Sequence, residues 1–448
     1  MSVPKYPKYK YSGVEWLGRI PSHWDVIQSR RLFCVRNEKA LESDRQVTAS
    51  QQYGILYQDD FVAREGRKVV ETIMGAHTLR RVKPNDFVIS LRSFQGGIEW
   101  SGIEGAITFH YVVLTPIKYV YEPFFAHLFK SMAFIHALRS TTNLIRDGQD
   151  LRFSHFIQVD LPIVSLPEQT AIATFLDAET SKIDALIAEQ RRLIELLKEK
   201  RQAVISHAVT KGQNPDATMK ASGIEWLGDV PEHSSVVALK HLVSRPIIDG
   251  PHVSPQKHDQ GVPFISAESI GKGFIDFDKK WGYISPEDHK VYSQRYSPQR
   301  GDILMVKLGA TTGVPAIVET DTDFSVWVPL AAIRLKDQIQ PYLIFHVLRS
   351  NNLRVAYQLS WTFGTQQTLG LGTISNLQMP VPPAQELQEI VNYLDAVLPG
   401  FDSLEAEATR AIDLLQERRT ALISAAVTDK IDVREISRGG AENAEKTK

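Results

Sequence analysis

The chain has 448 residues, of which 43% are hydrophobic and 23% are charged, and this composition is typical of a globular protein with a substantial core. Its length predicts two to four structural units rather than one. The 51 Lys and Arg residues nearly balance the 52 Asp and Glu residues, which leaves a formal net charge of −1. This balance argues against indiscriminate binding to polyanions, although local basic patches can still bind nucleic acid.

Cysteine content and the N-terminus indicate the compartment. Cys34 is the single cysteine, so neither an internal disulfide nor an all-cysteine zinc site can form, as is typical of a reducing cytosol. Residues 1–11 are a basic tail without the apolar core of a signal peptide. No apolar run approaches the roughly 18 residues that a membrane helix requires. We therefore expect a cytoplasmic protein that does not enter a membrane.

Two segments of the chain occur twice. Ser12-Gly13-Val14-Glu15-Trp16-Leu17-Gly18 returns as Ser222-Gly223-Ile224-Glu225-Trp226-Leu227-Gly228, and Pro21 and His23 return as Pro231 and His233. Residues 162–210 return without gaps as residues 380–428, with Asp184 and Arg201 matched by Asp402 and Arg419. The intervening residues agree only in outline. The chain is therefore a tandem duplication whose halves have similar ends and different middles.

The middles predict an α+β fold. Strands are expected at residues 86–91 and 106–114 of the first half, and at 301–307 and 330–335 of the second. A helix is expected in each half, at residues 123–139 and 341–359. Polar, glycine-containing loops follow at residues 92–97, 308–313 and 364–368. These loops are the places where a binding site is most easily built.

The repeated segment at residues 168–209 predicts one long amphipathic helix, since its apolar residues recur at steps of three and four and Gly212 follows its end. Its second copy supplies a partner helix of similar length. Leu398-Pro399-Gly400 should break or kink that second helix. The residues expected to pack the helices together are Ile183, Leu186, Ile187, Ile194, Leu197, Val204, Phe401, Leu404, Ile412, Leu415 and Leu422.

Motifs for catalysis are absent from the sequence. It contains neither an Asn-Pro-Pro-Tyr-like nor a Pro-Cys methyltransferase signature, and no Walker-type phosphate loop. Acidic-x-Lys patterns occur at Asp278-Lys279-Lys280 and Asp288-His289-Lys290, but neither pattern returns in the other half. His23 and His233 have no companion ligand at metal spacing, which favours a structural role. We therefore expect a binding protein with no catalytic site and no metal site.

The repeats resemble those of the specificity subunits of type I restriction-modification enzymes. The resemblance rests on Ser-Gly-[Val/Ile]-Glu-Trp-Leu-Gly before Pro-x-His, and on Pro167-Glu168-Gln169, Lys200-Arg201 and Val209-Thr210 in the long repeat. It implies two α+β target-recognition domains in a pseudo-twofold arrangement, joined by two long helices that form an antiparallel coiled coil. The second copy departs from this pattern at Leu387, where a Gln is expected, and at Pro399-Gly400.

The resemblance also implies a function. Each domain would read one half of a bipartite target in double-stranded DNA, and helix length would set the gap between the halves. The chain itself would bind no cofactor and catalyse no reaction. Two modification subunits would bring S-adenosylmethionine and the methyltransferase, and restriction subunits would bring the ATP-driven motor and the Mg-dependent nuclease. The expected boundaries are a tail at 1–11, a domain at 12–160, a spacer at 161–212, a domain at 213–378, a spacer at 379–430 and a tail at 431–448.

Candidate residues for DNA contacts follow from chemistry, because Arg pairs well with guanine and Asn or Gln with adenine. A solvated loop role or a phosphate contact is the alternative for each of them. The candidates are Arg92, Ser93, Gln95, Arg146, Gln149, Arg152, Lys307, Thr311, Thr312, Gln366 and Gln367. Three other functions stay open on the sequence: a stand-alone bipartite DNA-binding protein, a self-sufficient restriction endonuclease, and a coiled-coil scaffold that binds no nucleic acid.

Overall fold

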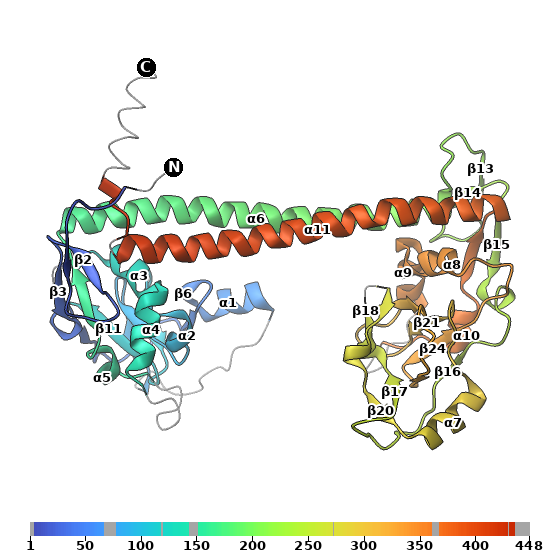
Figure 1. Cartoon of the computed structure of the whole chain (residues 1–448), viewed down its shortest axis with the longest axis horizontal. Coiled ribbons are helices and arrows are strands. Elements are labelled where there is room, and N and C mark those ends of the chain that lie inside the picture. The colour runs from blue at the N-terminus through green and yellow to red at the C-terminus, as the bar shows by residue number, and fades with distance from the viewer. Residues whose placement is uncertain are drawn as a thin grey trace. The chain divides into compact units, whose positions relative to one another are not determined.

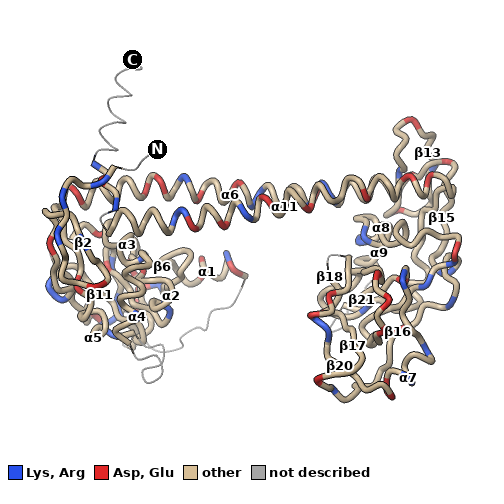
Figure 2. The backbone as a smooth tube through the Cα atoms, in the orientation of Figure 1, with Lys and Arg blue, Asp and Glu red and all other residues tan. Residues whose placement is uncertain are grey.

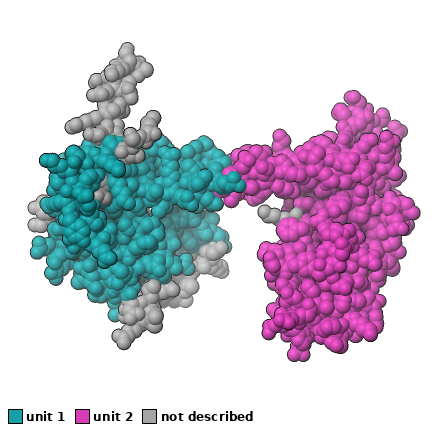
Figure 3. Space-filling model, in the orientation of Figure 1, with its two compact units in different colours: residues 1–190, 410–448 teal, residues 191–409 magenta. Residues whose placement is uncertain are grey.

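The computed structural model describes residues 4–66, 78–117, 120–142, 151–271, 273–360, 367–428 and 430–434. The chain divides into two compact units (Figure 3). Unit 1 comprises residues 1–190 and 410–448, and unit 2 comprises residues 191–409. Each unit combines strands and helices, which confirms the α+β fold class.

Unit 1 is built around strands that alternate with short helices (Figure 1). Its strands are β1 (Tyr9–Tyr11), β2 (Arg19–Pro21), β3 (Asp25–Gln28), β4 (Phe33–Val35), β5 (Val47–Ser50), β6 (Gly54–Tyr57), β7 (Arg80–Val82), β8 (Phe87–Ile89), β9 (Glu99–Trp100), β10 (Gly105–Ile107), β11 (Val112–Pro116) and β12 (Asp160–Ile163). Its helices are η1 (Ser29–Arg31), α1 (Gln58–Glu65), α2 (Ser93–Gly96), α3 (Glu122–Lys130), α4 (Met132–Ser140) and α5 (Phe153–Phe156).

Unit 2 follows a similar plan. Its strands are β13 (Met219–Ala221), β14 (Asp229–Pro231), β15 (Ser235–Ala238), β16 (Ile248–Asp249), β17 (Val262–Ile265), β18 (Ile270–Gly271), β19 (Phe274–Ile275), β20 (Gly282–Ile284), β21 (Ile303–Val306), β22 (Pro315–Ile317), β23 (Ser325–Val326), β24 (Leu330–Ile333) and β25 (Gln378–Val381). Its helices are η3 (Leu239–His241), η4 (Ala267–Ser269), η5 (Phe277–Lys279), α7 (Pro286–Arg295), α8 (Pro341–Arg349), α9 (Asn351–Ser360) and α10 (Leu371–Ser375).

A four-stranded antiparallel sheet lies at the centre of each unit. The strand order is β4-β11-β8-β9 in unit 1 and β16-β24-β21-β22 in unit 2. A two-stranded pair also recurs, as β3 with β12 and as β15 with β25. The core of unit 1 is rich in phenylalanine, and Phe33 makes an edge-to-face contact with Phe87 at a centroid distance of 5.5 Å. The core of unit 2 is mainly aliphatic.

Most of the expected elements form, but three are divided. β8, β21 and β24 confirm the strands expected at 86–91, 301–307 and 330–335. Residues 106–114 hold two strands, because a turn closed by the Tyr111 N–H and the Thr108 carbonyl separates β10 from β11. Each expected helix is also two helices. Ser131 is extended and its hydroxyl caps α4, and Ser350 is extended between α8 and α9.

The long repeats form α6 (Leu166–Lys211) and α11 (Ala384–Val427), helices of 46 and 44 residues. In unit 1 the start of α6 shares a core with the end of α11, and Asp184 pairs with Arg419. In unit 2 the end of α6 shares a core with the start of α11, and Arg201 pairs with Asp402. The two helices are therefore antiparallel within each unit, as expected. Acidic and basic residues alternate along both helices (Figure 2).

Two expectations for these helices are wrong. Leu186 and Leu404 were expected in the interface but are 45% and 48% exposed, because each helix buries only a narrow stripe against the other. Ile183 and Ile187 are buried as expected, and the remaining predicted packing residues are partly buried. The expected break at Pro399 does not occur, since α11 continues through it. Leu398 is buried in the core of unit 2, and this packing outweighs the hydrogen bond that proline removes.

Candidate nucleic-acid interface

The loops of interest leave equivalent strands of the two central sheets. Residues 90–98 join β8 to β9, and residues 307–314 join β21 to β22. A buried aspartate precedes each strand, Asp86 in unit 1 and Asp302 in unit 2. The same element of the repeated fold therefore presents both loops.

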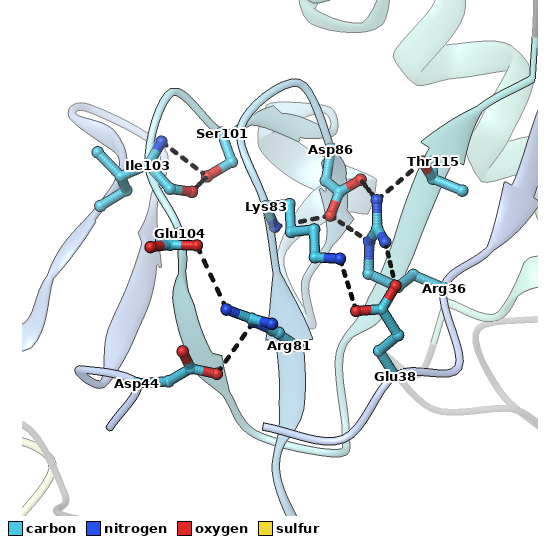
Figure 4. A network of polar contacts seen from close by, with 10 residues as sticks. All are labelled: Arg36, Glu38, Asp44, Arg81, Lys83, Asp86, Ser101, Ile103, Glu104 and Thr115. Atoms are coloured by element: carbon cyan, nitrogen blue, oxygen red, sulfur yellow. Dashed lines mark hydrogen bonds and ion pairs between the residues drawn. The ribbon is translucent and has the colours of Figure 1, made fainter. Parts of the chain in front are cut away.

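An arginine fixes each of these aspartates. The Arg36 guanidinium donates to Asp86 at 2.6 and 2.8 Å, and Lys83 N–H donates to the same carboxylate (Figure 4). In unit 2, the Arg334 guanidinium donates to Asp302 at 2.8 and 2.7 Å. The hydrogen bond between Asp86 and Arg36 raises the pKa of Arg36, so this ion pair stays charged. These contacts hold the turn before each strand and hence the start of each loop.

The loop of unit 1 contains three predicted residues, and the structure separates them. Arg92 and Gln95 are exposed. Ser93 is only 1% exposed, and its hydroxyl accepts a hydrogen bond from the Ser90 N–H. Ser93 therefore holds the turn and cannot reach DNA, and its prediction as a contact is wrong.

A pocket of about 440 Å³ adjoins this loop. Gln51 and Gln52, from the turn between β5 and β6, line it together with Gly96 and Lys130. The Gln51 amide donates to the Arg92 carbonyl at 3.1 Å, which joins the two loops. Gly97 has φ 81°, and a Cβ there would lie 2.1 Å from the Phe129 carbonyl oxygen. The loop therefore packs closely against α3.

The loop of unit 2 is brought together with a second predicted segment. Thr311 is exposed, while the Thr312 hydroxyl bonds to the carbonyls of Gly309 and Gln367 at 2.7 and 3.1 Å. Gln367 is exposed beside it. Thr311, Thr312 and Gln367 line one pocket of about 420 Å³. Residues far apart in sequence thus form one polar surface, although Thr312 serves mainly to join the two segments.

Lys307 is the second predicted contact that the structure does not support. Its side chain is 12% exposed, and its ammonium lies 3.2 Å from Asp249 Oδ2. Asp249 also pairs with Arg295 at 2.9 Å. Lys307 therefore neutralises an internal carboxylate and is not available for DNA. Arg152 is exposed ahead of α5, whereas Arg146, Gln149 and Gln366 lie outside the described residues.

Sequence reasoning missed several polar residues at the two pockets. Gln51 and Gln52 lie in a turn that no periodic pattern marks. Arg354 and Gln358 are exposed and line the pocket of unit 2. They are four residues apart within the helix expected at 341–359, so their shared face was a usable signal. Arg349 lines the same pocket from the end of α8.

The repeated histidines are structural, as expected. His23 Nε2 lies 2.9 Å from Glu168 Oε2, and His233 Nε2 lies 2.6 Å from Glu386 Oε2. The Tyr6 hydroxyl and the Trp24 indole also donate to Glu168. Burial and the neighbouring Glu168 carboxylate raise the pKa of Tyr6, so its hydroxyl stays protonated as a donor. Each turn thereby ties the opening motif of its half to the start of a long helix.

The acidic-x-Lys patterns do not converge on a site. The ammonium of Lys280 donates to the Phe277 carbonyl at 3.0 Å, and the Asp288 N–H donates to the Ser285 hydroxyl at the start of α7. His289 Nδ1 lies 2.9 Å from the Ser325 hydroxyl. Within the described ranges, no three His, Cys, Asp or Glu side chains gather as metal ligands would. None of the described helices has the length and apolar character to cross a membrane.

Two similar sheets, each presenting a polar loop beside a pocket, define a tandem-repeat binding protein. Comparison with known proteins shows what the chain is similar to. The model of the family described as type I restriction modification DNA specificity domain matches residues 251–413. The chain is 23% identical over 350 residues to the type I restriction enzyme EcoKI specificity subunit of Escherichia coli (strain K12), covering 74% of this chain and 72% of that protein.

A second relative, the EcoBI specificity subunit of Escherichia coli, is 27% identical over 259 residues, which cover 56% of this chain and 54% of that protein. A chain in a solved structure concerned with complex assembly and conformational transition of the type I R-M system shares the fold. Its TM-score is 0.64 at 14% identity, with 91% of this chain and 98% of that chain covered. Over most of its length the chain is thus similar to specificity subunits of type I restriction enzymes.

Proposed function

We propose that this chain reads a bipartite target in double-stranded DNA, with one half-site for each unit. The observation that carries the proposal is the contrast between the repeated scaffold and the loops that it presents. The equivalent loops after β8 and β21 offer Arg92 and Gln95 in unit 1 but Thr311 in unit 2, and the segments beside them add Gln51 and Gln367. Guanidinium and amide groups pair with base edges in the major groove, so two unlike sets would read two unlike sequences.

The chain itself catalyses no reaction under this proposal. It would direct modification subunits, which bring S-adenosylmethionine, and restriction subunits, which bring ATP- and Mg-dependent chemistry. This complex would work in the cytoplasm. The length of the helical repeat would set the gap between the half-sites. The ammonium of Lys280, the lysine of the first acidic-x-Lys pattern, donates to the Phe277 carbonyl at 3.0 Å, which argues against a nuclease there.

Exposed leucines on the long helices support docking of two partner subunits. Leu186 and Leu414 are 45% and 59% exposed in unit 1. The same repeat positions carry Leu404 and Leu196 in unit 2, which are 48% and 44% exposed. Large apolar side chains left in water at repeated positions favour burial by a protein partner. Their repetition in both units suits two copies of one partner.

Methylome sequencing tests this function. Cells that carry the chain with its modification subunit should show methylation at a split sequence, and deletion of this gene should remove it. Exchange of residues 90–98 for another polar loop should change one half of that sequence and leave the other half unchanged. A methylation pattern that survives deletion of the gene would overturn the proposal.

A further inference from the structure

Arg349, the last residue of α8, lines the pocket of about 420 Å³ in unit 2. The structure gives its backbone carbonyl a partner, the Gln202 amide. No described residue forms a salt bridge or side-chain hydrogen bond with its guanidinium, whose carbon stands 5.0 Å from the centroid of the Phe345 ring. A half-buried cation therefore faces the pocket without an internal anion.

The charges near Arg349 increase this imbalance. Arg201 is a second cation, and Asp402, the carboxylate that acts on Arg349, already pairs with Arg201 at 2.6 Å. Burial and the charge of Arg201 lower the pKa of Arg349 to about 10, and Asp402 offsets only part of this effect. The guanidinium thus remains charged at neutral pH while it lacks a counterion.

Unit 1 shows how the same position is neutralised. Lys130 ends α3 as Arg349 ends α8, and a serine follows each of them. Lys130 forms an ion pair with Glu99, which is 3% exposed and faces Val88 across the sheet. Burial raises the pKa of Glu99, and the Lys130 charge opposes that rise. The first unit therefore carries its own counterion at this place.

Unit 2 lacks that carboxylate. The residue that faces Leu304 on β22, in the place of Glu99, is Ala316. Ala316 is buried in an apolar cluster, so β22 offers no carboxylate to the cation that ends α8. An uncompensated charge in a partly buried place is costly, so its retention points to an anion supplied from outside.

The pocket suits an anion with several oxygen atoms. Arg354 adds a second guanidinium, Thr311 a hydroxyl, and Gln358 an amide. Two glycines keep the space open: a Cβ at Gly273 would lie 3.0 Å from Arg349 Nη1, and a Cβ at Gly313 would lie 2.7 Å from Tyr357 Cδ2. A fork of N–H donors beside hydroxyl and amide groups is the usual environment of a phosphate group.

We infer that Arg349 binds one backbone phosphate of the DNA half-site that unit 2 reads. This inference rests on the proposed function. Arg349 then fixes the position of the half-site, while neighbouring loop residues read the bases. Unit 1 does not bind a phosphate at the equivalent place, since Glu99 already neutralises Lys130.

The salt dependence of DNA binding tests the inference. The chain assembled with its modification subunits is titrated with a duplex that carries the split target found by methylome sequencing. Arg349→Gln should weaken binding on the order of tenfold, as expected for loss of one charge-assisted hydrogen bond. It should also reduce the slope of log affinity against log salt by about 0.9, the value for one phosphate. Both losses should be equal for every base variant of the half-site.

Two further variants separate this effect from a folding defect. Arg349→Lys keeps the positive charge at this place and should retain the wild-type slope. Lys130→Gln is the matched change in unit 1 and should leave the slope unchanged. Hydrogen exchange of the β21 amides reports whether unit 2 stays folded in each variant.

A scan with single methylphosphonate linkages identifies the phosphate. One neutral linkage should weaken binding by the wild-type complex but cause no additional loss with Arg349→Gln. The inference fails if folded Arg349→Gln keeps the wild-type slope, or if Arg349→Gln changes base preference at one position. Lack of half-site preference in the wild-type complex would instead refute the proposed function.

Discussion

The two units have the same central sheet but differ in what they place on it. Both bury an aspartate before the loop strand, and both end the first helix of a pair with a cation and a serine. Unit 1 neutralises that cation with Glu99, whereas unit 2 has Ala316 and leaves Arg349 without an internal anion. The duplication has thus kept the groups that position the loops and varied the groups beside the pockets. Comparison of equivalent residues separates scaffold from binding surface.

The largest expected effect tests the shared scaffold. Asp302 is 2% exposed and accepts hydrogen bonds from Arg334, from the Tyr296 hydroxyl and from the Gln299 N–H. Asp302→Ala leaves these donors unpaired and should destabilise unit 2 by about 3–5 kcal/mol. Native-state hydrogen exchange of the β21 and β24 amides measures this loss.

Asp86→Ala is the matched change in unit 1. It should destabilise the β8 and β11 amides by a smaller amount, because Arg36 keeps a second partner in Glu38 at 2.7 Å. If either substitution destabilised both units by the same amount, the two units would not have separate scaffolds.

The next effect concerns the unlike loops. Thr311→Ala combined with Gln367→Ala should weaken recognition of one half-site, and Arg92→Ala combined with Gln95→Ala should weaken recognition of the other. Loss of a good base contact costs about 1–3 kcal/mol, or roughly tenfold to a hundredfold in affinity. Methylation rates on targets altered in one half-site at a time measure each loss. If both pairs of substitutions impair the same half-site, the assignment of one unit to each half is wrong.

Low pH should destabilise unit 2 more than unit 1. His346 is buried, and its pKa falls to about 3 because of burial and the charges of Arg349 and Arg201. Burial lowers the pKa of His127 in unit 1 as well, but Asp177 at 2.7 Å opposes that shift. A histidine whose folded pKa is depressed binds fewer protons than in the unfolded chain. Its unit therefore loses stability as the pH falls below the unfolded value of about 6.5.

Unit 2 should thus lose about 2 kcal/mol more at pH 5 than at pH 7 through His346 alone. His346→Leu removes the titrating group and should abolish this loss, whereas His127→Leu should change the acid response of unit 1 by less. Hydrogen exchange of each central sheet at both pH values measures the effect. An acid response of unit 2 that persists in His346→Leu would show that another group causes it.

Much of the scaffold was accessible from the sequence because its signals are periodic or repeated. The apolar stripe of α6, the duplicated His23 and His233, and the strands at β8, β21 and β24 all follow from local patterns. The division of the two expected helices was missed, because Ser131 and Ser350 interrupt an otherwise continuous helical pattern. Packing, which decides where such a pattern breaks, involves residues distant in sequence.

The binding surface was harder to predict for the same reason. Residue type alone predicted Ser93 and Lys307 as DNA contacts. In the structure, Ser93 holds a turn and Lys307 pairs with Asp249. Gln51 reaches the loop of unit 1 from a different pair of strands. Whether a polar side chain faces solvent or satisfies a buried group depends on its tertiary partners, which no local pattern records.

The smallest expected effect concerns the paired helices, where the repeat gives two equivalent ion pairs. Asp184 pairs with Arg419 at 2.9 Å in unit 1, and Asp402 pairs with Arg201 at 2.6 Å in unit 2. The pair in unit 1 is the more solvent-exposed, so Asp184→Asn should cost only about 0.2–1 kcal/mol. Asp402→Asn should cost more than Asp184→Asn, because Arg201 Nε is buried without a hydrogen-bond partner among the described residues and the Arg349 charge lies nearby. Double-mutant cycles with Arg419→Gln and Arg201→Gln measure the two coupling energies. Equal costs in the two units would mean that Asp402 does not shield Arg349 from Arg201, which would contradict the charge imbalance assigned to unit 2.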